Sequence, residues 1–247
     1  MSDFAWHPTR DAIERAQLTR FLRQTGEPDF DAMLARSQQD PAWFTSELIR
    51  FLDIRFTRPY DRIVDLADGI QWPRWCVGGE MNIVDSCLRW PERQPAVIWE
   101  GEEGFTRTLS YGELEREVTK WAAGLQSLGV GMGDAVGIHL PMVPETVIAL
   151  LALARIGAVA TPLFSGYGAA AIATRLNDVA AKVLITCDGF PRRGKWVNAH
   201  QTAQEAIEQC PTVEHVITLD RHGVADWPEA KPAPVRTQAE DPLIVIY

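Results

Sequence analysis

The sequence predicts an α/β fold, in which an open, mostly parallel sheet is flanked by helices and preceded by a helical N-terminal extension. From about residue 96, short aliphatic runs alternate with longer segments of helical periodicity. Such alternation is typical of a parallel sheet with right-handed crossovers. Residues 1–75 lack these runs and carry helix signals instead. We therefore predict two domains, a helical extension at 1–75 and an α/β part at 76–247.

The clearest helix signal of the extension is DPAWFTSELIRF, which starts at Asp40. Asp is a good N-cap, and Pro41 suits the first helical position because it needs no hydrogen-bond acceptor there. Phe44, Leu48 and Phe51 then recur at helical spacing. They predict one apolar face for this helix.

The expected strands are short apolar runs rich in β-branched residues. They are AVIWE (96–100), AVGIHL (135–140), AVATPLF (158–164), KVLITC (182–187), HVITL (215–219) and LIVIY (243–247). Runs of this length and composition indicate strands that are buried on both faces of a parallel sheet. The last run follows an acidic-proline turn, and we expect it to form a fully buried strand.

The expected helices lie between these runs. In SYGELEREVTKWAAGLQSLG (110–129), Ser110 and Glu113 form a capping box and Gly129 is a natural stop. PETVIALLALARIG (144–157) is apolar nearly all round, which predicts a buried helix. Two further helices are expected within 166–181 and 197–209. The Pro-rich stretch 220–240 is expected to be irregular.

Composition excludes several classes of function. A net charge of −9 argues against binding to nucleic acid or to anionic membranes. The N-terminus has no secretory signal, and the apolar stretch 147–154 is too short to cross a bilayer. Four widely spaced cysteines, with no CxxC, HExxH or GxSxG motif, favour free thiols over disulfides, metal ligands or a serine nucleophile. We expect a cytoplasmic protein with no metal ligands among these residues.

Two glycine-bearing segments differ in what they predict. GVGMGD (129–134) follows a helix and opens a strand, the reverse of a dinucleotide-binding motif, so it predicts a turn. LFSGYG (163–168) lies between a strand and a helix, near the carboxyl end of a strand, where α/β sheets bind ligands. Gly166 and Gly168 permit close approach of the backbone to an anion. A plain turn that starts a helix is the structural alternative.

A basic segment, CDGFPRRGKW (187–196), directly follows another strand. Arg192, Arg193 and Lys195 place three cations on one short loop of an acidic protein, and both side-chain types pair well with phosphate. The alternative is a solvated basic loop without function. If both loops are functional, they could share one phosphorylated ligand.

Taken in order, several segments resemble the AMP-forming acyl-CoA synthetases, in particular the acetyl-CoA synthetase branch of the adenylate-forming superfamily. The resemblance covers roughly residues 40–247, and PMVPE and ARIGAV are quite specific to this branch. The matching segments are GGEMNIVDSCLRW, AVIWEGEEG, LSYGELEREV, LGVGMGDAVGIHLPMVPETVIALLALARIGAVATPLFSGYG, KVLITCDGFPRRGK, VEHVITL and EDPLIVIY.

The resemblance implies an acid–thiol ligase that uses ATP, Mg²⁺ and coenzyme A. Such enzymes join a small carboxylate, here by default acetate or another short-chain acid, to ATP and then pass the acyl group to CoA. In this family the strand matched by LIVIY precedes the loop that holds the ATP phosphates. We therefore expect an N-terminal fragment, inactive alone, whose adenylation machinery lies in a missing C-terminal portion of the same chain. No catalytic residue is assigned.

The resemblance also implies a partial CoA site. Its residues are Phe164, Ser165 and Gly166 at the adenine end, with Arg192 and Lys195 on the 3′-phosphate and Arg193 sharing that role. Ser165 stands where a glycine is usual, and Pro191 and Arg193 depart from the family's basic loop. Two alternatives stay open. One is a CoA- or nucleotide-binding module without catalysis, and the other is a structural partner that docks through an open sheet edge.

Overall fold

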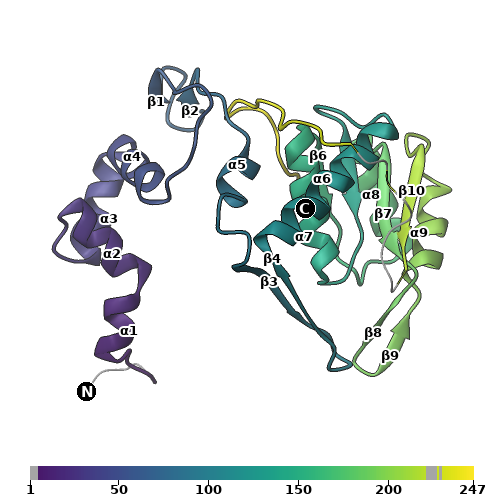
Figure 1. Ribbon diagram of the computed structural model, residues 1–247. Helices are drawn as coiled ribbons and strands as arrows, with labels where there is room; N and C mark the ends of the chain where they lie inside the picture. Colours follow the sequence, from purple (N-terminus) through teal and green to yellow (C-terminus); the bar gives the residue numbers. More distant parts are fainter. Residues whose placement is uncertain (1–4, 221–226, 228–229) are drawn as a thin grey trace. The chain divides into compact units, whose positions relative to one another are not determined.

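The computed structural model describes residues 5–220, 227 and 230–247 (Figure 1). The chain forms two compact units, Met1–Arg55 with Tyr60–Gly78 and Phe56–Pro59 with Gly79–Tyr247. The division into domains at residue 75, made from sequence, stays a prediction.

The first unit is mainly helical, as predicted. Its helices are α1 (Arg10–Arg15), α2 (Gln17–Thr25), α3 (Phe30–Gln39) and α4 (Pro41–Phe51). The predicted cap of α4 is confirmed, because the Asp40 side chain accepts a hydrogen bond from the Trp43 N–H at 2.9 Å. The buried Phe21 of α2 packs edge-on against Phe44 and Phe51. The unit also contains an antiparallel hairpin that the sequence analysis did not predict, β1 (Arg62–Asp65) with β2 (Arg74–Val77).

The second unit is built on a four-stranded parallel sheet with the strand order β10-β7-β5-β6. These strands are β5 (Ala135–Ile138), β6 (Val159–Pro162), β7 (Val183–Cys187) and β10 (His215–Leu219). The helices of this unit are α5 (Ile83–Cys87), α6 (Tyr111–Ser127), α7 (Pro144–Ile156), α8 (Ala169–Asp178) and α9 (Ala199–Ile207). The predicted α/β class, a parallel sheet flanked by helices, is confirmed.

Helices cover both faces of this sheet (Figure 1). On one face, α6 and α7 bury Val118 and Ile148 in one apolar cluster with Val136 and Ile138 of the sheet. On the other face, α8 and α9 form a second apolar cluster that includes Leu184 of the sheet. Because every residue of β5 and β7 is buried, both strands need cover on both faces. Each large aliphatic side chain fully buried in this way contributes about 1.5–3 kcal/mol.

The helix boundaries follow the local signals in the sequence. The capping box of α6 is present, since the Ser110 N–H donates to Glu113 Oε2 at 2.8 Å and the Glu113 N–H donates to Ser110 Oγ at 3.3 Å. Gly129 and Gly133 have φ of 76° and 82°, so GVGMGD is a turn, as predicted. Helix α7 begins at Pro144 and ends at Ile156, and the residue after it, Gly157, adopts the left-handed conformation.

Two of the expected strands differ from the prediction. The run at 96–100 forms β3 (Pro95–Glu100), but it pairs antiparallel with β4 (Thr106–Ser110) outside the parallel sheet. The reason is connection length, because a short turn joins antiparallel strands whereas a parallel pair needs a crossover. Residue Ile98 of β3 is accordingly 78% exposed.

The segment LIVIY was expected to be fully buried, and that prediction was wrong. It runs parallel to β6, where the Ala160 N–H donates to the Leu243 carbonyl at 3.0 Å and the Val245 N–H donates to the Ala160 carbonyl at 2.9 Å. However, Ile244 is 37% and Ile246 is 73% exposed. No strand of the described residues pairs with its other edge, so only one side of the segment is protected.

A buried asparagine ties α5 to the rest of the second unit. Asn82 is 2% exposed and caps α5, where its Oδ1 accepts from the Val84 N–H at 3.1 Å. Its Nδ2 donates to the carbonyls of Ala154 and Val235, both at 2.8 Å. One side chain therefore satisfies backbone groups of three separate segments.

We predict that Asn82→Ala lowers the free energy of unfolding by about 2–4 kcal/mol, because the cap is lost and buried carbonyls lose their donor. Urea denaturation measures this loss. The matched control is Asn198→Ala, an exposed N-cap that makes one such bond to the Gln201 N–H and should cost about 1 kcal/mol. Equal losses in the two variants would contradict the role assigned to Asn82.

Candidate functional site

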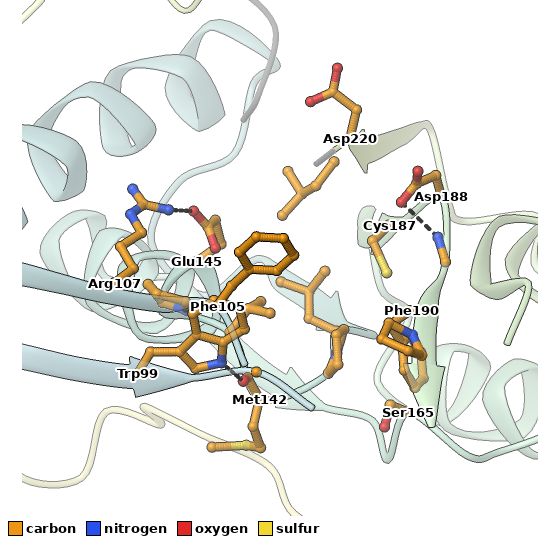
Figure 2. A pocket seen from close by; sticks show the side chains of 18 of the residues that line it. Trp99, Phe105, Arg107, Met142, Glu145, Ser165, Cys187, Asp188, Phe190 and Asp220 are labelled. Carbon is orange, nitrogen blue, oxygen red and sulfur yellow. Dashed lines mark hydrogen bonds and ion pairs between the residues drawn. The ribbon is translucent and has the colours of Figure 1, made fainter. Parts of the chain in front are cut away.

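A cavity of about 1010 Å³ lies at the carboxyl ends of β5, β6, β7 and β10 (Figure 2). Its walls come from the β3–β4 hairpin, α6, the loop 140–145 with the start of α7, the start of the loop after β6, the segment 187–192 and the end of β10. This is the edge of the sheet at which open α/β folds bind ligands.

The β3–β4 hairpin forms one wall and is fixed to the loop after β5 by two side-chain contacts. The indole Nε1–H of Trp99 donates to the Met142 carbonyl at 2.6 Å. Arg107 forms an ion pair with Glu145 in the first turn of α7. Figure 2 shows both contacts at the edge of the cavity. Trp99 of β3 is paired directly with Arg107 of β4. The two strands are therefore attached to the loop 140–145 at the same point along the hairpin.

The opposite wall contains the basic segment, which was predicted as a loop but forms a hairpin. Its strands are β8 (Phe190–Arg192) and β9 (Lys195–Val197). The two residues between them, Arg193 and Gly194, have φ of 51° and 73°. Two successive positive φ values indicate the type I′ turn that joins antiparallel strands tightly. The strands are too short to show periodicity, and Arg is not a typical first residue of such a turn, so the sequence signal was weak.

The predicted glycine loop and basic segment meet at Gly166. The guanidinium carbon of Arg192 lies 5.0 Å from the ring centroid of Phe164. A Cβ atom at position 166 would lie 2.5 Å from Arg192 Nη1 and 2.7 Å from Phe164 Cε1. A side chain at 166 would therefore push the Arg192 guanidinium and the Phe164 ring aside, so the absence of a Cβ at 166 is what lets these two side chains lie together. Phe164, Ser165 and Arg192 all line the cavity.

The β8–β9 hairpin carries three cationic side chains close together in sequence. Arg192 and Lys195 are directly opposite in the antiparallel pair, so their side chains emerge on the same face. Within the described part of the chain, the side chains of Arg192, Arg193 and Lys195 form no ion pair. Like charges directly opposite each other destabilise a hairpin. A bound anion would relieve that repulsion.

A thiol also lines the cavity, at the end of β7. Burial, together with the adjacent carboxylate of Asp188, raises the pKa of Cys187 to about 12. Since the thiolate is the nucleophilic form of cysteine, this side chain is almost entirely protonated and unreactive near neutral pH. Cys187 is part of the wall and not a candidate nucleophile.

His139 directly follows β5 and is a buried side chain of the second unit. It is 1% exposed, and its Nδ1 lies 3.2 Å from Thr186 Oγ1. Burial lowers the pKa of this imidazole, so the neutral form predominates at neutral pH. The residue does not line the cavity.

The described residues give no indication of a metal site or a membrane segment. Across 5–220, 227 and 230–247, no group of three or more His, Cys, Asp or Glu side chains is arranged to hold a metal ion. Among the same residues, no helix is both long and apolar enough to cross a membrane.

The class of protein follows from comparison with known families. The chain belongs to the AMP-binding enzyme family, whose model matches residues 84–247. A second model, for the acetyl-coenzyme A synthetase N-terminus, matches residues 30–87. The resemblance inferred from sequence is thereby confirmed.

The similar proteins include CoA synthetases that are named for different acids. The chain is 37% identical over 231 residues to acetyl-coenzyme A synthetase of Deinococcus radiodurans, covering 91% of this chain and 35% of that protein. It is 36% identical over 237 residues to 3-hydroxypropionyl-coenzyme A synthetase of Metallosphaera sedula, covering 87% and 35%. Acetoacetyl-CoA synthetase from Streptomyces lividans has a similar structure, with a TM-score of 0.86 and 28% identity over 98% of this chain and 41% of that one. The chain thus spans well under half the length of these relatives.

Proposed function

We propose that this chain is the N-terminal part of an AMP-forming acyl-CoA synthetase and that it binds the 3′-phosphate and adenine of coenzyme A. One observation carries the proposal. Arg192 and Lys195 project from the same face of the β8–β9 hairpin without an acidic partner among the described residues, and Arg192 lies against Phe164 at the cavity. The names of the relatives support the choice of ligand.

The charged end of CoA fits this arrangement chemically. The 3′-phosphate accepts hydrogen bonds from the guanidinium of Arg192 and the ammonium of Lys195, and Arg193 adds a third cation at the exposed turn. The ring of Phe164 is 53% exposed. It offers a face on which adenine can stack, an interaction worth about 1–3 kcal/mol. Ser165 and Gly166 supply backbone groups beside it.

The proposed reaction of the whole protein has two steps. The carboxylate of a small acid attacks the α-phosphate of ATP, forming an acyl-adenylate and releasing pyrophosphate. The CoA thiol then attacks the acyl carbon, the carbon–oxygen bond to AMP breaks, and acyl-CoA and AMP leave. We propose acetate or another short-chain acid as substrate. Mg²⁺ would offset the charge of the ATP phosphates. We propose that the magnesium site and the adenylation residues lie in the remainder of the protein. This chain alone is therefore proposed to be inactive.

Within this chain the prediction concerns affinity. CoA should bind roughly 10- to 100-fold more tightly than dephospho-CoA, because one charge-assisted hydrogen bond, such as that from Arg192 to the 3′-phosphate, contributes about 1.5–3 kcal/mol. Isothermal titration calorimetry at low salt measures both constants. Arg192→Gln should remove most of the difference, whereas Arg116→Gln, an exposed arginine on α6 outside the cavity wall, should not. Equal affinities of the wild-type chain for the two ligands would contradict the proposed phosphate site.

For the whole protein the prediction concerns turnover. The coding sequence should continue past Tyr247, and its complete product should release pyrophosphate in the presence of ATP, Mg²⁺ and a short-chain carboxylate. The 247-residue chain should not. In the complete product, Arg192→Gln should raise KM for CoA and leave KM for ATP unchanged. A stop codon directly after Tyr247, or turnover by this chain alone, would overturn the proposed division of labour.

A further inference from the structure

The tip of the β3–β4 hairpin lies beside the turn of the basic hairpin (Figure 1). Glu102, in the β3–β4 turn, accepts a hydrogen bond from the backbone N–H of Arg193, with 2.8 Å between Oε2 and N. The two residues are 91 positions apart in the chain, so this contact is tertiary. Glu102 also lines the cavity.

Glu102 is the one acceptor for the Arg193 N–H among the described residues. This amide belongs to the first residue of the type I′ turn, and no backbone carbonyl of its own hairpin accepts from it. The turn is also locally unfavourable. Arg193 is a non-glycine residue with φ of 51°, a conformation that costs about 1–2 kcal/mol and that Asn, Asp and Gly adopt more readily. Glu102 therefore stabilises a type I′ turn in which Arg193 is an unfavourable first residue.

The β3–β4 hairpin is well placed to act as a support. Away from its tip, this hairpin is fixed to the loop 140–145 by two contacts. Trp99 donates to the Met142 carbonyl, and Arg107 pairs with Glu145. Its tip then holds the turn between Arg192 and Lys195 through Glu102. The β3–β4 hairpin thus connects the first turn of α7 to the turn that separates Arg192 and Lys195, the two cations on one side of β8–β9.

We propose that Glu102 is a positioning residue of the phosphate site, acting through the Arg193 turn to set the spacing of Arg192 and Lys195. The inference rests on the proposed function. It runs against simple electrostatics, because a carboxylate close to bound phosphate repels it. An effect through charge and an effect through position therefore have opposite signs, and two substitutions separate them.

The experiment compares Glu102→Ala, which removes the acceptor and the charge, with Glu102→Gln, which removes only the charge. Binding of CoA and of dephospho-CoA is measured on the 247-residue chain, together with hydrogen exchange at the Arg193 amide. In Glu102→Ala, the ratio of the CoA affinity to the dephospho-CoA affinity should fall about 3- to 10-fold. This change corresponds to the net free energy of one typical hydrogen bond. The Arg193 amide should exchange faster. Glu102→Gln should stay within about twofold of wild type in the affinity ratio, because the amide oxygen remains an acceptor.

Two controls keep the result interpretable. Glu115→Ala removes an exposed carboxylate of α6 that does not line the cavity, and it should leave the ratio unchanged. The affinity for dephospho-CoA serves as an internal control, since misfolding lowers both affinities whereas misplacement of Arg192 and Lys195 lowers only that for CoA.

An unchanged ratio in Glu102→Ala would overturn this inference and leave the proposed function intact. A higher ratio in both Glu102 variants would also overturn it, because Glu102 would then act only through its charge. A wild-type chain that does not distinguish CoA from dephospho-CoA would overturn the proposed function, and the inference with it.

Discussion

The need to cover both faces of the parallel sheet determines the rest of the second unit. Strands β5 and β7 are buried throughout, so both faces of the sheet must be covered. Because the strands are parallel, each strand is joined to the next one in the chain by a crossover over one face. Parallel direction then brings the carboxyl ends of all four strands to one edge. The residues after these strands line a common cavity because of this constraint, although they are far apart in sequence.

Two antiparallel hairpins outside the sheet form walls of the cavity at that edge. They are short, exposed and rich in charge, and neither could be stable alone. One is fixed by Trp99 and Arg107, and the other by the contacts of Arg192 and Arg193. The basic hairpin keeps two like charges side by side, an arrangement that lowers stability and favours an anionic ligand. Stability is thus reduced at the place where the ligand is proposed to bind.

The sequence predicted the features that depend on local chemistry. The capping box of Ser110, the caps of α4, the turn at Gly129 and the strands of the central sheet follow from residue types within a few positions of one another. The two loops at the sheet edge were also found, since each follows an apolar run. Their shared position at the cavity could be anticipated from the parallel topology, but the close approach of Arg192 and Phe164 to Gly166 could not, because it depends on the placement of the Arg192 side chain.

Features that depend on tertiary contacts were missed or wrongly predicted. The hairpins β1–β2 and β8–β9 have strands of three or four residues, too short to give a period. Residues 243–247 have the composition of a buried strand, yet burial depends on what covers them, which composition does not specify. Glu102 gave no signal in the sequence, because an exposed acidic residue in a turn has no distinctive pattern.

The central claim, that the Phe164 loop and the basic hairpin form one phosphate-binding site, can be tested by titrating the ¹⁵N-labelled chain with adenosine 3′,5′-bisphosphate. This ligand carries the adenine and the 3′-phosphate of CoA without its pantetheine arm. We predict saturable changes in the amide chemical shifts of residues 164–166 and 190–197, with much smaller changes at the turn 129–134. Changes confined to other residues, or none at millimolar ligand, would contradict the claim.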